Sequence, residues 1–511
     1  MSAILSAEAL NDFIAPSLEC IKPIEQLPPP PENPNGELSV THDNDQTPLP
    51  ARTAAQISLT DCLACSGCVT SSEAVLIQLQ SHTEVLDSLQ RFPNKTFIAL
   101  VSPQTRAALA VALNIPEQTA GNMITNFLTS IPGKAFDYVL DTNPFRELSL
   151  EYAAQEVLES LATEKKKPIL TSACPGFICY LESTHPELIP HLSAMKSPQA
   201  IAGTFLKSLL HAERKLAPED IYVVSIMPCF DKKLEGARQE LTSTAWLPGA
   251  EEPVRDIDCV ITTRELLSMA ELLHTDFRAA SCATPARAAP SAALEPFLTP
   301  QGNGPAESGS SGGTLVRILR ALQAAHPDAT LSIQPGRNVD TRDYILTSPS
   351  GEAIAKLSRC YGFRNIQNLV RKLKPPKVRR LPGATARAPV RRGKAEVQAV
   401  YTEVMACPGG CTNGGGQIKV DDDEVWGEVE GRPESQKELL GRVDEAYFSE
   451  GEGDEGGEGR KAKGVVEMWE MVTGLEKEKL LHTNYRVVEN DLGGKLQDHE
   501  VLEIASRPAA W

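Results

Sequence analysis

The spacing of the cysteines restricts the fold and the chemistry of this chain more than any other feature of its sequence. Among its 12 cysteines, three lie within seven residues, Cys62, Cys65 and Cys68, and two lie within five, Cys407 and Cys411. Cysteines this close together are poorly placed to bridge distant loops through disulfides and well placed to surround one metal centre. They therefore predict metal binding in a reducing compartment.

The N-terminal group has a Cys-x-x-Cys-x-x-Cys spacing, which lets one loop reach three corners of a cubane iron-sulfur cluster. No fourth cysteine follows Cys68 closely, so we expect the remaining ligand to be Cys20, which stands alone near the N-terminus. Residues 21–57 are rich in Pro, Asn and Asp and lack periodicity, which indicates an extended connection. Two alternatives stay open: zinc bound by the same thiols, and a three-cysteine cluster with one open iron position.

Four further cysteines stand in unusual local settings. Cys174 and Cys229 each adjoin a proline, while Cys407 and Cys411 precede the glycine-rich residues 413–417. Glycines let the backbone approach a bulky cofactor closely, and four thiols on three loops make a complete ligand set for a second cluster. The last four cysteines match no such pattern and are interpreted as unligated thiols: Cys179, Cys259, Cys282 and Cys360.

From Thr96 onward, short β-rich runs alternate with amphipathic helical stretches. The clearest runs are Phe97–Val101, Tyr138–Leu140, Ile221–Met227 and Cys259–Thr262. This alternation predicts an α/β fold, with parallel or mixed sheets flanked by helices on both faces. Ligands bind beyond the carboxyl ends of the strands in such sheets, and Cys174 and Cys229 each follow an apolar run.

Composition divides the chain into four segments. We expect an N-terminal cluster-binding segment with a Pro-rich linker over residues 1–95, and the α/β core over 96–420. Loop-like insertions into the core, one rich in small residues and one basic, are expected near 279–313 and 371–394. An acidic low-complexity insertion over 421–464 and a C-terminal tail over 465–511 complete the chain. The basic insertion suits a nuclear-import signal or an acidic partner, although a solvated loop is the simpler interpretation.

Charge and hydropathy exclude two classes of partner. The net charge of −17 argues against direct nucleic-acid binding, because such binding depends on an excess of Lys and Arg. No run approaches the ~20 apolar residues of a membrane-spanning helix, and no basic residue precedes the apolar positions of Met1–Pro16. We therefore expect a soluble protein whose partners are other proteins or small molecules.

Several loops resemble the signature loops of iron-only hydrogenases. They comprise residues 171–176, 227–235 and 403–417. Residues 196–199 resemble the segment that joins the first two loops, and residues 480–485 resemble a small-subunit tail. Within that superfamily, the four N-terminal cysteines and the terminal Trp511 are most similar to one eukaryotic group. This group comprises the hydrogenase-like factors of cytosolic iron-sulfur protein assembly, related to the prelamin-recognition factor.

The resemblance implies a two-lobed, iron-only-hydrogenase-like core and two 4Fe-4S clusters. Its implied ligands are Cys20, Cys62, Cys65 and Cys68 for the first cluster, and Cys174, Cys229, Cys407 and Cys411 for the second. It further implies a non-catalytic factor of the cytoplasm and of the nucleus. This factor would carry clusters from an assembly scaffold to a targeting complex with a WD40-type adaptor and to client apoproteins. Trp511 would dock on that complex, the alternative being that it packs on its own domain.

Departures from the hydrogenase pattern bear on activity. Ala173 replaces the cysteine that relays protons in hydrogenases, and Ala153 aligns with their relay carboxylate. A methyl group cannot relay a proton, so we predict no hydrogen turnover. Lys232 matches a lysine that faces a diatomic ligand in hydrogenases, so the pocket retains polar character. The rival hypotheses are an iron-only hydrogenase or related electron-transfer enzyme, and a scaffold in which both clusters are purely structural.

Overall fold

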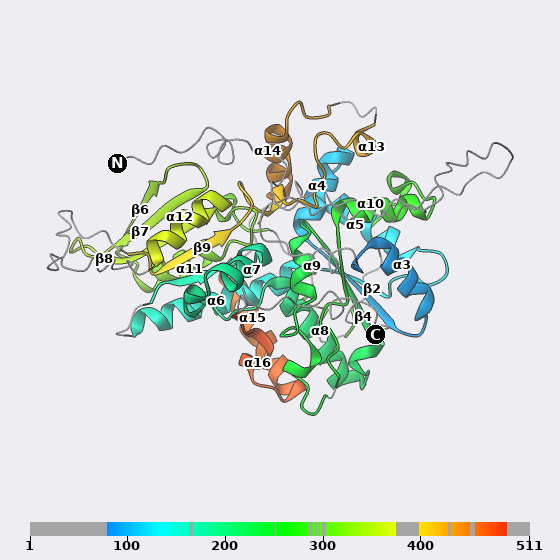
Figure 1. Cartoon of the computed structure of the whole chain (residues 1–511), viewed down its shortest axis with the longest axis horizontal. Coiled ribbons are helices and arrows are strands. Elements are labelled where there is room, and N and C mark those ends of the chain that lie inside the picture. Colours follow the sequence, from blue (N-terminus) through cyan, green and yellow to red (C-terminus); the bar gives the residue numbers. More distant parts are fainter. Residues whose placement is uncertain are drawn as a thin grey trace, which may run out of the picture.

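The computed structural model describes residues 79–163, 167–250, 252–285, 289–291, 294–295, 297–298, 303–374, 398–427, 431–449 and 455–487. These residues form two lobes, each built on one β-sheet (Figure 1). The predicted α/β class and the two-lobed core with helix-flanked sheets are thereby confirmed.

The first lobe contains a parallel four-stranded sheet in the order β2-β1-β4-β5. Its strands are β1 (Thr96–Val101), β2 (Tyr138–Asp141), β4 (Ile221–Met227) and β5 (Cys259–Thr262). All seven residues of β4 are buried, because helices cover both faces of the sheet. Such burial requires the near-continuous apolar sequence that β4 has. The four β-rich runs expected from the sequence coincide with these strands to within one residue at each end.

Helices cover both faces of this sheet. One face packs against α3 (His82–Arg91), α4 (Pro103–Leu113), α5 (Glu117–Thr129), α10 (Thr263–Leu272) and α14 (Gln436–Tyr447). The other packs against α6 (Asn143–Ala162), α8 (Pro198–Arg214), α15 (Glu455–Thr473) and α16 (Lys477–Leu481). Within β1 the side chains alternate between the two cores, as strand geometry requires: Phe97 and Ala99 enter the first, and Ile98 and Leu100 the second.

The second lobe contains a mixed five-stranded sheet in the order β3-β9-β8-β7-β6. Its strands are β3 (Ile169–Thr171), β6 (Thr330–Pro335), β7 (Thr341–Thr347), β8 (Ala353–Tyr361) and β9 (Tyr401–Met405). Strands β3, β9 and β8 run parallel, whereas β7 and β6 add antiparallel strands at one edge. One face packs on α7 (Pro175–Thr184) and α12 (Phe363–Leu373), and the other on α11 (Thr314–Ala325) and α6.

The 20-residue helix α6 joins the two lobes. Its N-terminal part places Phe145 and Leu148 in the core of the first lobe, while Ala154 and Val157 enter the core of the second. The remaining short helices are α9 (Asp231–Gly236), α13 (Asp423–Trp426), η2 (Pro186–His191), η3 (Pro218–Asp220), η4 (Ser243–Ala245), η5 (Phe277–Ala279), η6 (Ala306–Ser308) and η7 (Cys411–Asn413). Among the described residues, no helix combines the length and apolar character needed to cross a lipid bilayer.

Two segments that composition set apart contribute to the packed core. The segment near 279–313 contributes to the core, because Leu294 is buried in it and the Phe297 ring lies 5.7 Å from the Phe145 ring. The division expected at residue 464 falls inside α15, whose Trp469 is fully buried. The acidic segment and the C-terminal tail therefore share one helix. Of the basic insertion, residues 375–394 lie outside the described residues.

Just before α3, Gln80 is hydrogen-bonded to α9. Its side chain donates to the Lys233 carbonyl oxygen (2.8 Å) and accepts from the Val260 amide (3.1 Å). In return the Lys233 ammonium donates to the Gln80 carbonyl oxygen (2.6 Å) and to Glu265 (2.7 Å). Lys233 is only 1% exposed, so these contacts compensate a buried charge.

Candidate metal centre

Three loops bring four cysteines to the carboxyl ends of strands from both sheets. Cys174 is the N-cap residue of α7, three residues beyond β3, and Cys407 lies two residues beyond the neighbouring strand β9. Cys411 begins η7 in the same loop as Cys407. Cys229 lies two residues beyond β4 of the other sheet. The expectation that these loops sit beyond the carboxyl ends of strands is confirmed.

Hydrogen bonds hold the three loops against one another. The Ser172 hydroxyl donates to the Val404 carbonyl oxygen (2.6 Å) and accepts from the Cys174 amide (3.1 Å), which joins the first loop to β9. The Gly416 amide donates to the Pro228 carbonyl oxygen (3.0 Å), which joins the third loop to the second. At Gly414 a Cβ atom would stand 2.3 Å from that same oxygen, so only glycine allows this approach.

Burial raises the pKa of all four thiols, that of Cys174 to about 12. Their charges also act on one another: Cys411 raises the pKa of Cys174, Cys174 and Cys411 raise that of Cys229, and all three raise that of Cys407. Cys229 and Cys411 keep part of their residue surface exposed, yet their sulfur atoms lie deep enough for burial to dominate. The structure therefore brings the four thiols together, and metal binding must release their protons.

Two charged side chains adjoin the thiols. Asp231, 5% exposed, raises the pKa of each of the four. Lys232 acts oppositely on Cys229 and Cys411, and its ammonium lies 2.8 Å from a carboxylate oxygen of Glu235. A site of four thiolates and one carboxylate carries an excess of negative charge, which a cationic metal centre would offset.

Polar groups beside the sulfur atoms act against burial. The backbone at Phe177 and Ala406 lowers the pKa of Cys174 in part, and the Ser311 side chain lowers that of Cys411 in part. The Cys411 amide donates to the Ser311 hydroxyl (3.0 Å). Such second contacts orient ligands and stabilise a thiolate.

The donor set fits an iron-sulfur cluster, because four thiolates are the ligands of a cubane. Within the part of the chain that the structure describes, no group of three or more His, Cys, Asp or Glu side chains is arranged to hold a single metal ion. The assignment of the four thiols as ligands stays a prediction.

A cavity of about 40 Å³ adjoins the loop of Cys174 and has room for roughly three water molecules. Ala153 and Ala173, the two positions that depart from the hydrogenase pattern, both line it. Ser193, Lys196 and Ser311 contribute polar groups to the same wall. The structure thus gathers around one space these five residues, which include Ala173, next to Cys174 in the sequence, and Ser311, the partner of Cys411.

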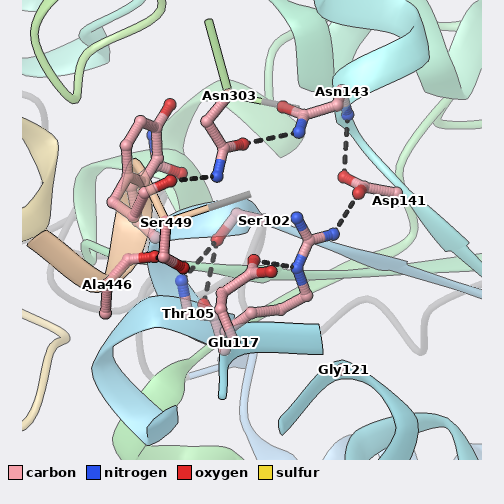
Figure 2. A network of polar contacts seen from close by, with 12 residues as sticks. Ser102, Thr105, Glu117, Gly121, Asp141, Asn143, Asn303, Ala446 and Ser449 are labelled. Carbon is pink, nitrogen blue, oxygen red and sulfur yellow. Dashed lines mark hydrogen bonds and ion pairs between the residues drawn. The ribbon is translucent and has the colours of Figure 1, made fainter. Parts of the chain in front are cut away.

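A buried ionic network lies at the carboxyl edge of the four-stranded sheet (Figure 2). Arg106 on α4 pairs with Glu117 on α5 and with Asp141 at the end of β2. Burial alone would lower the pKa of Arg106, but Asp141 and Glu117 raise it instead. The arginine thus stays charged and ties two helices to a strand.

The same network continues toward the cysteine loops. The Asn143 amide group donates to Asn303 (2.6 Å), as Figure 2 shows. Asn303 donates in turn to the Tyr447 carbonyl oxygen (2.6 Å). Asn303 lies eight residues before Ser311, the residue in contact with Cys411. The segment that the sequence marked as an insertion therefore connects this network to the candidate metal centre.

The N-terminal candidates Cys20, Cys62, Cys65 and Cys68 lie outside the described residues, as does Trp511. Of the four cysteines interpreted as unligated, Cys259 and Cys360 are buried in apolar cores, which raises the pKa of both. Cys282 is exposed, and Cys179 lies one turn into α7.

The comparisons with known proteins decide the family. Residues 95–415 match the family model described as iron only hydrogenase large subunit, C-terminal domain. A protein of Phaeosphaeria nodorum is 42% identical over 98% of this chain and 98% of its own length, and one of Sclerotinia sclerotiorum is 44% identical over 99% of each. Both are named cytosolic Fe-S cluster assembly factor NAR1. The chain belongs to the NAR1 family.

Solved structures of FeFe-hydrogenases share the fold of this NAR1 family chain. A variant of FeFe-hydrogenase HydA1 from Chlamydomonas reinhardtii is 22% identical, with a TM-score of 0.57, over 80% of this chain and 99% of its own. A second, apo variant of the same hydrogenase is 23% identical with the same TM-score and coverage. This likeness concerns the fold alone.

Sequence reasoning missed two residues of the site. Asp231 carries a visible signal, because it follows Cys229 by two residues in a loop already singled out. Ser311 carried none, since its Gly- and Ser-rich surroundings indicated a loop rather than a contact with Cys411.

Proposed function

We propose that this chain is a non-catalytic component of the cytosolic machinery that assembles iron-sulfur proteins. It binds two 4Fe-4S clusters and passes clusters from an assembly scaffold to a targeting complex and to client apoproteins. The names of the relatives support the assembly role. The proposed ligands are Cys20, Cys62, Cys65 and Cys68 for the N-terminal cluster, and Cys174, Cys229, Cys407 and Cys411 for the inner cluster.

The convergence of four buried thiols from three loops carries this proposal. A bound cluster would supply positive charge and iron positions for the thiolates. The chain's own residues do the rest. Ser172 joins the first loop to β9 and accepts from the Cys174 amide, and Gly414 allows the third loop to approach the second. Lys232 offsets part of the negative charge.

The absence of catalysis is supported by Ala153 and Ala173. Both line the cavity next to the loop of Cys174, at the positions where hydrogenase-like chemistry needs a proton donor, and neither side chain can carry a proton. The relatives are named as assembly factors and not as hydrogenases, although the fold is shared.

The proposed partners follow from the same role. They are the assembly scaffold, a targeting complex with a WD40-type adaptor, and client apoproteins, with Trp511 as the contact to the adaptor. The indole of Trp511 offers a partner an apolar anchor and a hydrogen-bond donor. We place the protein in the cytoplasm and also in the nucleus.

Anaerobic reconstitution tests the proposal. The wild type should hold about eight iron atoms and an equal amount of sulfide per chain, with the electron paramagnetic resonance of reduced cubanes. Cys62→Ala and Cys407→Ala should each remove about half of the iron. Cys360→Ala is the matched control, because it removes a buried thiol outside both sets and should retain all iron. Zinc in place of iron, or four irons or fewer in the wild type, would contradict the two-cluster proposal.

A further inference from the structure

A C-terminal strap, residues 481–486, crosses the molecule next to the candidate metal centre. It pairs with the segment that precedes α8: the Lys196 amide donates to the Leu481 carbonyl oxygen (2.8 Å), and the Thr483 amide donates to the Ala194 carbonyl oxygen (2.8 Å). An antiparallel bridge between Met195 and His482 lies between these two bonds. The strap thus acts as a short strand added to residues 192–196.

Residues 192–196 lie between the strap and β3. On the β3 side, the Ser193 amide donates to the Leu170 carbonyl oxygen (2.9 Å), and Leu192 forms a parallel bridge with Leu170. On the strap side, the Tyr485 hydroxyl donates to the Ser193 carbonyl oxygen (2.6 Å). The Tyr485 ring packs against the apolar cluster that contains Cys174, and burial raises the pKa of its hydroxyl.

The segment held by the strap is a wall of the cavity. Ser193, Met195 and Lys196 line the cavity, as does Ala173, the residue next to Cys174. The wall is also held by α6, because the Ser193 hydroxyl donates to Glu156 and the Ser149 hydroxyl donates to the Lys196 carbonyl oxygen (3.5 Å). Loss of the strap would therefore remove the contacts on one side of the wall and leave those with β3, α6 and α8.

The end of the strap also contacts α7. The Arg486 amide donates to Glu182 (2.7 Å), which is buried on α7 and receives two hydrogen bonds from Arg238 (2.6 and 3.0 Å). Cys174 directly precedes α7, and Arg238 lies two residues beyond α9, the helix that follows Cys229. The strap therefore holds in place the helices that follow two of the four thiols.

We propose that the strap is a gate on the inner cluster site, an inference that rests on the proposed function. While the strap is paired, residues 192–196 close the cavity beside Cys174 and keep solvent and a thiolate-bearing acceptor away from the four thiols. When it detaches, the wall loosens and the site becomes accessible. Beyond Leu481, which is fully buried, the strap fits a segment that can leave, because His482, Asn484 and Arg486 are exposed and the Tyr485 hydroxyl is bonded to the Ser193 carbonyl oxygen.

Tyr485→Phe in the full-length protein tests the gate, because it removes one hydrogen bond and keeps the ring that fills the core. Loss of one hydrogen bond should speed strap opening by about threefold to tenfold. Hydrogen exchange at the Lys196 amide, which the strap protects, should accelerate by that factor. Iron should be lost to an excess of a ferrous chelator faster by the same factor, measured in a Cys62→Ala background so that only the inner site reports.

Tyr138→Phe is the matched control. It removes a tyrosine hydroxyl that accepts from Arg214 (3.2 Å) on another part of the first lobe, and should change neither rate. If Lys196 exchange accelerates while iron loss stays at the wild-type rate, the strap opens without gating and the inference is overturned. Unchanged exchange and unchanged iron loss overturn it as well.

Failure of the proposed function gives a separate result. If the wild-type protein and Cys407→Ala bind the same amount of iron, inner-cluster binding is refuted, whatever the strap does. The gate is then judged on the metal-free protein by alkylation of Cys174 with iodoacetamide. Faster alkylation in Tyr485→Phe than in Tyr138→Phe supports a gate, and equal rates overturn it.

Discussion

Gly414→Ala tests whether the third cysteine loop must touch the second. The φ of Gly414 is −65°, which any residue adopts, so the backbone itself tolerates alanine. The added Cβ would stand 2.3 Å from the Pro228 carbonyl oxygen, whereas ordinary contact begins at 3.4 Å. The loops must therefore separate by about 1.1 Å. Because Pro228 precedes Cys229 and Gly414 follows Cys411, this shift acts directly on two of the four thiols.

Overpacking of this kind lowers the free energy of unfolding by about 1–3 kcal/mol. We expect Gly414→Ala to lower the thermal midpoint of the metal-free protein and, after reconstitution, to lose about half of the iron. The matched control is Gly441→Ala on α14, where no atom lies within 4 Å of the added Cβ. Replacing that helical glycine should stabilise the protein by about 0.5–1 kcal/mol and leave the iron unchanged. Full iron and a wild-type midpoint in Gly414→Ala would refute the close approach of the two loops.

Three further outcomes are expected. Cys407→Ala should lower the thermal midpoint of the reconstituted protein more than Cys20→Ala does, because the inner ligands come from both sheets. Equal effects would show that the inner cluster does not stabilise the fold more than the N-terminal cluster does. The reconstituted protein should evolve no hydrogen from a strong reductant above a cluster-free control, for want of a proton donor at Ala173. Deleting Trp511 should leave iron and midpoint unchanged while weakening capture of the WD40-type adaptor; loss of iron or of stability would instead make Trp511 a core residue.

The first lobe was readable from the sequence and much of the second was not. Strands buried on both faces, such as β1 and β4, are near-continuous apolar runs that stand out from the helices between them. In β6 nearly every residue is exposed, so no apolar period marks it. Leu294 and Phe297 are two apolar anchors within an Ala- and Pro-rich stretch, whose average composition indicated a loop.

For the candidate site, cysteine spacing predicted the residue types and the loops but not their surroundings. Ser311 meets Cys411 across 100 residues of sequence, and Ser193 meets Tyr485 across 292. Contacts of this range are set by the packing of the two sheets and leave no local pattern in the sequence. Asp231 and Lys232 differ in this respect, because both follow Cys229 closely in the sequence.

The fastening of Gln80 to α9 sets a limit on how far apart the two proposed clusters can be. Cys68 and Gln80 are 12 residues apart, and a fully extended chain of that length spans at most about 43 Å. Because Gln80 is bound to the helix that follows Cys229, chain length alone limits the distance of Cys68 from Gln80 to about that value. Confinement on this scale corresponds to a local concentration on the order of millimolar. Any exchange of iron or electrons between the two sites is thus a first-order process, whose rate does not change when the protein is diluted.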